Sequence, residues 1–167
     1  MLLKIRNIII IYLLILVAFI IQSTIFSKFT ILGCAPNLML ILTFCAGYTR
    51  GRVPGVLMGF FSGLCLDVFF SDVIGFNALV LLIIGYVSGI MNKNYNNNSV
   101  YTPLLILLGS DVFYCIVYYC AWFGLRGKFE IAYYAVHIIL PEFLLTLIAG
   151  LIIYIPLSKL YRKLSYD

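Results

Sequence analysis

The sequence predicts an all-α, polytopic membrane protein with about six transmembrane helices. Of its 167 residues, 64% are hydrophobic and only 10% are charged, and the mean hydropathy is +1.12. A soluble domain carries roughly a quarter charged residues, and no soluble core of this size could hide so much apolar surface from water. The lipid bilayer is therefore the expected solvent for most of the chain.

The apolar runs that predict the spans are separated by short polar turns. A helix needs about 20 apolar residues to cross the hydrocarbon core. Lys4 and Arg6 precede the first run and no A-x-A cleavage pattern follows it, which favours a retained span over a signal peptide. The chain is expected to form one transmembrane domain, 1–167, with spans at about 8–27, 36–49, 53–70, 74–91, 101–123 and 141–158.

Prolines mark the starts of four of these spans. Pro36, Pro54 and Pro103 lie near the first residues of the second, third and fifth spans. The last apolar stretch is too long for a single straight span. Its helix is therefore expected to start near Pro141, because a proline in the first turn removes no hydrogen bond. Residues 129–140 are then expected to form a short interfacial segment.

The basic residues predict the orientation. With an even number of spans, both termini lie on one side, together with these residues: Lys4, Arg6, Arg50, Arg52, Lys93, Lys159, Arg162 and Lys163. The opposite side holds Lys28, Arg126 and Lys128. The positive-inside rule then places both termini in the cytoplasm. This rule and anionic lipid headgroups account for the net charge of +5, so no nucleic-acid partner is expected.

Sequence patterns of enzymes and metal sites are missing. The five cysteines show no C-x-x-C and no metal-ligand spacing, and four lie in apolar runs, where cysteine acts as a small hydrophobic residue. The chain contains no H-E-x-x-H, no G-x-S-x-G and no phosphate-binding glycine loop. We therefore expect a protein that is not an enzyme and that holds no metal and no cofactor.

Glycines recur at four-residue spacing on the third and fourth spans: Gly55, Gly59, Gly63, Gly85 and Gly89. Asp67 takes the next place in the first series. Such a row on one helix face lets another helix backbone approach closely. The rows predict packing between helices of this chain or docking of a separate membrane protein, and both can occur on different faces.

Asp67 is a carboxylate within a span, which costs about 2.5–3.5 kcal/mol on insertion scales. A rise of about 1.5 Å per residue places it about 20 Å from the cytoplasmic end, with Asn77 at about 21 Å and Asn37 at about 17 Å on neighbouring spans. We expect a polar cluster in the outer half of the membrane, in which Asn77 or Asn37 donates to Asp67. The cluster either fixes helix register or lines a small-ligand site in an outward cavity.

The fifth span carries Asp111 near the membrane midplane. Tyr114 and Tyr118 follow at i+3 and i+7, on the same helix face, and a tyrosine hydroxyl can satisfy the carboxylate locally or across to another helix. A proton relay is the alternative, but the single histidine, His137, lies in the interfacial segment. Glu142, in the first turn of the last span, is expected to interact with the positive end of that helix dipole.

Residues 35–92 also carry an ordered pattern of motifs. Pro-polar-Leu opens the second span, an R-G-R turn follows at 50–52, the glycine row leads to G-L-x-x-D ending at Asp67, and G-F-x-A-L from Gly75 opens the fourth span. This pattern resembles the rod shape-determining protein MreD family, with which the length and number of spans also agree. One departure is Asn37, where the family often has Asp, and it halves the carboxylates of the expected cluster.

The resemblance implies a non-catalytic scaffold in the bacterial inner membrane that takes part in cell elongation. Its implied partners are the bitopic protein MreC and the actin-like MreB filament, with the RodA glycosyltransferase and its penicillin-binding transpeptidase as indirect partners in lateral peptidoglycan synthesis.

The family fold is similar to the six-helix substrate-binding component of energy-coupling-factor vitamin transporters. The alternative function is therefore vitamin capture, with a small ligand bound at Asn37, Asp67 and Asn77. Such components often carry small residues on the first helix, where this chain offers only Ala18 among large aliphatic residues.

Overall fold

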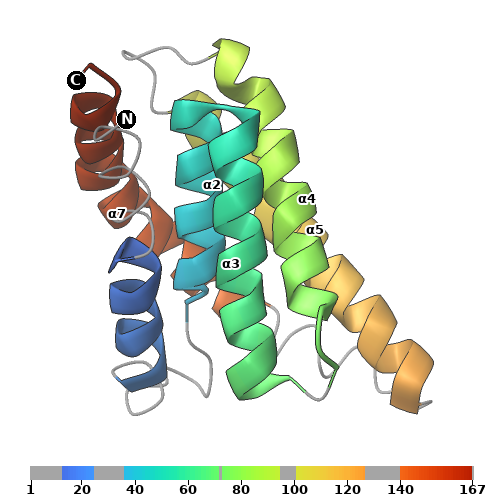
Figure 1. Ribbon diagram of the computed structural model, residues 1–167. Coiled ribbons are helices and arrows are strands. Elements are labelled where there is room, and N and C mark those ends of the chain that lie inside the picture. Colours follow the sequence, from blue (N-terminus) through green and yellow to red (C-terminus); the bar gives the residue numbers. More distant parts are fainter. Residues whose placement is uncertain (1–12, 25–35, 72, 95–100, 127–139, 167) are drawn as a thin grey trace.

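The computed structural model describes residues 13–24, 36–71, 73–94, 101–126 and 140–166, and in this part of the chain all regular structure is helical. After a helical segment at 13–24, the elements are α2 (Leu38–Arg50), α3 (Arg52–Phe70), α4 (Phe76–Ile90), the 3₁₀ helix η1 (Met91–Asn94), α5 (Tyr101–Arg126) and α7 (Leu140–Tyr166). In Figure 1, α2, α3 and α4 run side by side, and α5 and α7 cross behind them.

Within the described residues, two helices are long and apolar enough to cross a bilayer: Arg52–Phe70, with 19 residues and a mean hydropathy of 1.8, and Thr102–Ala121, with 20 residues and 1.9. The shorter apolar helices are Leu13–Thr24, Leu38–Arg50, Phe76–Ile90 and Glu142–Tyr154. Each helix overlaps one of the runs that the sequence assigns to a span. The number of six spans stays a prediction.

The last two helices continue past the ends of the expected spans. α5 reaches Arg126 and α7 reaches Tyr166, whereas Pro141 lies in the first turn of α7 as expected. A helix satisfies its own backbone groups in water as well as in lipid, so the end of an apolar run does not mark the end of the helix. Except for Leu140, the expected interfacial segment at 129–140 lies outside the described residues.

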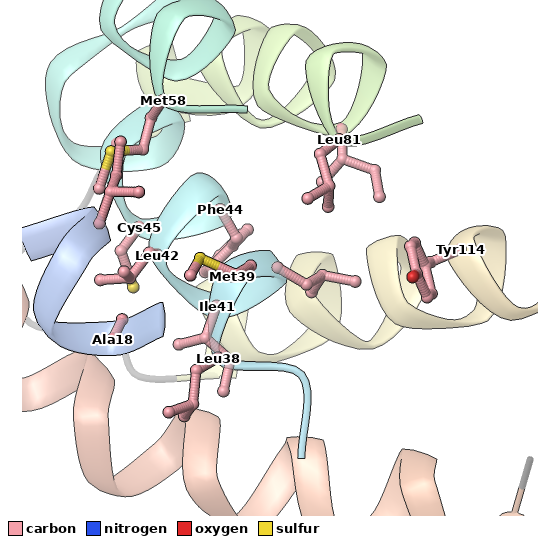
Figure 2. Packing of buried hydrophobic residues seen from close by; sticks show 14 of the residues in the cluster. Ala18, Leu38, Met39, Ile41, Leu42, Phe44, Cys45, Met58, Leu81 and Tyr114 are labelled. Carbon is pink, nitrogen blue, oxygen red and sulfur yellow. The ribbon is translucent and has the colours of Figure 1, made fainter. Parts of the chain in front are cut away.

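α2 occupies the centre of the bundle. Eleven of its 13 residues are buried, as expected for a helix that is apolar on every face. In Figure 2 its side chains form a cluster with residues of other helices, with Met58 of α3 above them and Leu81 of α4 and Tyr114 of α5 further to the right. At its carboxyl end, Tyr48 lies 6.4 Å from Tyr154 of α7, measured between ring centroids. The other helices therefore shield α2 from lipid.

The helices around α2 expose large apolar side chains on their outer faces. More than half of the surface is exposed at Val53, Phe69, Leu79, Leu105 and Ile152. In water such a surface would be an aggregation hazard, whereas lipid tails are its natural complement. Apolar residues therefore cover the outer surface as well as fill the core, which supports the membrane environment that the composition predicts.

Candidate functional site

α3 and α4 touch through their backbones at the glycines singled out in the sequence. A Cβ atom on Gly55, Gly59 or Gly63 would collide with backbone atoms of α4, and a Cβ on Gly85 would collide with the carbonyl group of Gly55. Gly89 makes an equally close approach to the backbone at the start of α3. We call this contact the glycine seam. A helix of the chain itself covers the row, so these glycines are not open to a separate protein.

α2 adds a sixth residue, Gly47, to the glycine seam. A Cβ at this position would collide with the hydroxyl group of Ser88 and would lie 2.6 Å from the carbonyl oxygen of Gly85. The G-x-x-x-G spacing of Gly47 with Gly51 is the sequence signal that could have identified it. Three helix backbones therefore come close to one another at one point of the seam.

The carboxylate of Asp67, only 1% exposed, caps α4 from the neighbouring helix. Its Oδ2 atom accepts from the backbone N–H groups of Gly75 at 3.0 Å and Ala78 at 2.9 Å. Its Oδ1 atom accepts from the backbone N–H of Asn77 at 2.9 Å and from the side-chain amide at 3.0 Å. The hydrogen bond expected from Asn77 is thus present.

This cap provides hydrogen-bond acceptors for the first backbone N–H groups of α4. The first N–H groups of a helix have no acceptor within the helix, and the hydrocarbon core offers no water in their place. α4 begins after Gly75, which adopts a left-handed conformation with φ of 98° and gives no side-chain cap. Asp67 supplies the missing acceptor from α3, and its negative charge faces the positive end of the helix dipole.

Asn77 extends the hydrogen bonds to a third helix. Its side-chain nitrogen also donates to the hydroxyl oxygen of Ser71 at 2.6 Å. Its oxygen accepts from the hydroxyl group of Tyr114 on α5 at 3.0 Å. The position of Tyr114 in the sequence did not indicate this partner. Which face of α5 lies against α4 depends on packing between the helices and cannot be derived from the sequence of one helix.

Asn37 joins α2 to the same group of residues. It is the N-cap of α2, accepts from the N–H of Leu40 at 3.1 Å, and its side chain also interacts with Tyr114. Its backbone N–H donates to the hydroxyl oxygen of Thr146 on α7 at 3.2 Å. Asn37 therefore meets Asp67 only through Tyr114 and Asn77.

We call these residues the polar cluster: Asn37, Asp67, Ser71, Asn77, Tyr114 and Thr146. They come from α2, α3, α4, α5 and α7 or from the residues directly next to them. The three residues expected from the sequence are all buried: Asn37 is 5% exposed, Asp67 1% and Asn77 4%. Because their polar groups already bind one another, the geometry favours a role in helix register over an open ligand site.

Of the two tyrosines that could satisfy Asp111, Tyr114 makes its hydrogen bond elsewhere. The hydroxyl group of Tyr114 lies far enough from its own helix to reach Asn77 on α4 instead. The ring of Tyr118 stacks on that of Tyr114, with centroids 5.9 Å apart. Asp111 is 1% exposed, and its Oδ2 atom has no hydrogen-bond partner in the described structure.

A second carboxyl group lies near Asp111. Glu142, in the first turn of α7, is close enough for its charge to act on Asp111. The backbone oxygen of Glu142 accepts from the hydroxyl group of Thr146 at 2.8 Å. His137, which a proton relay would need as a further member, lies outside the described residues. The pair remains an acidic site without a described basic partner.

Replacing Asp111 with asparagine is expected to leave the free energy of unfolding unchanged or to raise it by about 1 kcal/mol. The substitution keeps the shape of the side chain but removes a buried charge that faces another carboxyl group. Thermal unfolding of the purified protein in detergent measures the effect. A clear loss of stability would show that the Asp111 charge is paired in the folded protein.

The fold and the site together define a membrane protein whose described regular structure is helical and whose polar cluster links its helices by hydrogen bonds. In the described ranges, no group of three or more His, Cys, Asp or Glu side chains could hold a metal ion. The family model of the rod shape-determining protein MreD matches residues 4–164, and the chain therefore belongs to this family.

This match confirms the resemblance seen in residues 35–92 and extends it over nearly the whole chain. Searches of the curated proteins and of the solved structures found no matching protein. The similarity of fold to the vitamin-transporter component therefore stays a prediction.

Proposed function

We propose that this chain is a non-catalytic scaffold of the bacterial cell-elongation machinery. Membership of the family supports a role in rod-shape determination. The observation that carries the scaffold function is the closure of the polar cluster. Asp67, Asn77 and Tyr114 form hydrogen bonds with one another. This favours a structural role for these residues over a catalytic site or a binding site for a small molecule.

The proposed partners are an MreC-like bitopic protein and the actin-like MreB filament, with the RodA glycosyltransferase and the penicillin-binding transpeptidase as indirect partners. The proposed location is the inner membrane, crossed several times, with both termini in the cytoplasm. The exposed apolar outer faces of α3, α4, α5 and α7 support this proposal, because a partner's transmembrane helix can replace lipid there without unfolding the bundle.

Vitamin capture is less well supported. A ligand bound at Asn37, Asp67 and Asn77 would have to displace the hydrogen bonds that cap α4 and α2. Each N–H group left without an acceptor in the hydrocarbon core costs several kcal/mol. The affinity for a small ligand would have to offset this loss.

Depletion of the protein in its native rod-shaped cell tests the proposal. We expect the cells to become round as the protein is lost, because lateral wall synthesis loses its organisation. Light microscopy measures the ratio of cell length to width, and expression of the wild-type chain from a plasmid should restore the rods. An MreC-like protein should also copurify with the tagged chain, whereas an unrelated bitopic protein should not.

A parallel culture supplemented with vitamins provides the discriminating control. The scaffold proposal predicts that supplementation leaves the cells round. If vitamins restored growth and shape in the depleted strain, the function would instead be vitamin capture. Cells that stay rod-shaped after complete depletion would also contradict the proposal.

A further inference from the structure

A hollow of about 560 Å³ lies at the end of the bundle where α2 turns into α3. Figure 1 shows this turn at the upper end of the two helices. Sites for small ligands have volumes of about 300–1,000 Å³, so a phosphate-bearing headgroup fits the available space. The lining residues that matter here are Arg50, Gly51, Arg52, Gly89, Ile90 and Asn92.

Short-range contacts hold the walls of this hollow in place. Gly51, with φ of 97°, is the single residue between α2 and α3, so the two arginines lie on either side of one tight turn. The close approach of Gly89 to the backbone of Arg52 holds α4 against this turn. The side chain of Asn92 donates to the carbonyl oxygen of Tyr48 at 2.6 Å.

The lining is positively charged. It contains two arginines and no acidic residue. The guanidinium of Arg52 lies over the ring of Tyr86, 5.9 Å from its centroid, and this cation–π contact keeps the charge beside the hollow. A planar guanidinium can donate two hydrogen bonds to one phosphate group, so the hollow suits a phosphate anion.

An exposed apolar strip continues from the hollow along α3. Val53, which also lines the hollow, is 70% exposed, and Leu57, one turn further along α3, is 47% exposed. Residues three or four positions apart share a helix face, so the strip runs away from the charged end. A cationic hollow above an apolar strip matches an amphiphile rather than a free anion.

We propose that this hollow binds the phosphate group of an anionic phospholipid, whose acyl chains lie along the apolar strip. Basic pockets between membrane helices are suited to such headgroups on physical grounds. The inference does not depend on the scaffold function, because none of the residues of the polar cluster takes part. In the proposed orientation the lipid belongs to the cytoplasmic leaflet.

Native mass spectrometry of the full-length protein in detergent tests this proposal with added phosphatidylglycerol or phosphatidylcholine. We expect phosphatidylglycerol to remain bound and phosphatidylcholine to dissociate. The double substitution Arg50→Gln with Arg52→Gln is expected to weaken phosphatidylglycerol binding roughly 30-fold, since each basic residue near an anionic headgroup contributes about fivefold. Replacing both arginines with lysine should retain most of the affinity.

The matched control is Lys159→Gln with Arg162→Gln on α7, which removes the same charge at another place and should leave the affinity nearly unchanged. Equal weakening by both double substitutions would overturn the proposal in favour of general charge attraction. Equal binding of both lipids, or displacement of the lipid by an equal concentration of glycerol 3-phosphate, would overturn it as well. If the double arginine variant does not fold, Arg52→Gln alone should lower the affinity about fivefold.

Discussion

Replacing Gly55 with alanine is expected to lower the free energy of unfolding by about 3 kcal/mol, although it adds only one methyl group. The new Cβ atom would overlap the carbonyl oxygen of Gly85 and lie 2.6 Å from the Cα atom of Gly47. Both are backbone atoms that cannot rotate away, so α3 has to move off α2 and α4. Thermal unfolding of the purified protein in detergent measures the loss.

Gly109→Ala is the matched control on α5. Gly109 is exposed, and an added Cβ atom would meet no other atom within 4 Å. Because alanine favours a helix over glycine by up to about 1 kcal/mol, this variant should be as stable as the wild type or slightly more stable. The difference between the two variants isolates the collision in the glycine seam. Equal unfolding midpoints would show that α3 and α4 do not approach as closely as described.

Replacing Asp67 with asparagine is expected to cost about 3 kcal/mol, because several charge-assisted hydrogen bonds are lost together. The amide nitrogen of the new side chain would face N–H donors at the start of α4 instead of accepting from them. The substitution keeps the shape of the side chain, so lost packing does not contribute. The unfolding midpoint in detergent and the shape of cells that express only this variant are the measurements.

Asp111→Asn provides the internal control for this substitution. Both aspartates are 1% exposed, yet Asp67 accepts four hydrogen bonds and Asp111 has one oxygen without a partner in the described structure. We expect the first substitution to destabilise the protein and the second to leave its stability unchanged or raised. The opposite order would contradict the assignment of Asp67 as the cap of α4.

Parts of the polar cluster could be predicted because depth in a membrane is simple to calculate. The regular rise of a helix placed Asp67 and Asn77 at the same depth, and the structure joins them by a hydrogen bond. Depth alone does not distinguish between neighbours at the same level. Asn37 lies in the same layer, yet it binds Thr146 and the start of its own helix.

The glycine seam, too, could be predicted only in part from the sequence. Spacing identified Gly55 and Gly85 as points of close approach, since four residues return the chain to nearly the same face. It did not show that the two would touch each other, nor that Gly47 of α2 would complete the contact. The central position of α2 was also not predicted, because its apolar residues resemble those of a lipid-facing helix in composition.

The sequence by itself determined the all-helical membrane class, the approximate place of each helix and the residues that share a face. These follow from composition, from the absence of water in the bilayer core and from the fixed rise and period of a helix. Only the tertiary structure decided that Tyr114 reaches Asn77, that one oxygen of Asp111 has no partner among the described residues and that the arginine turn borders a hollow. The rotation of each helix about its axis, and the choice of its neighbours, depend on the packing of all the helices together.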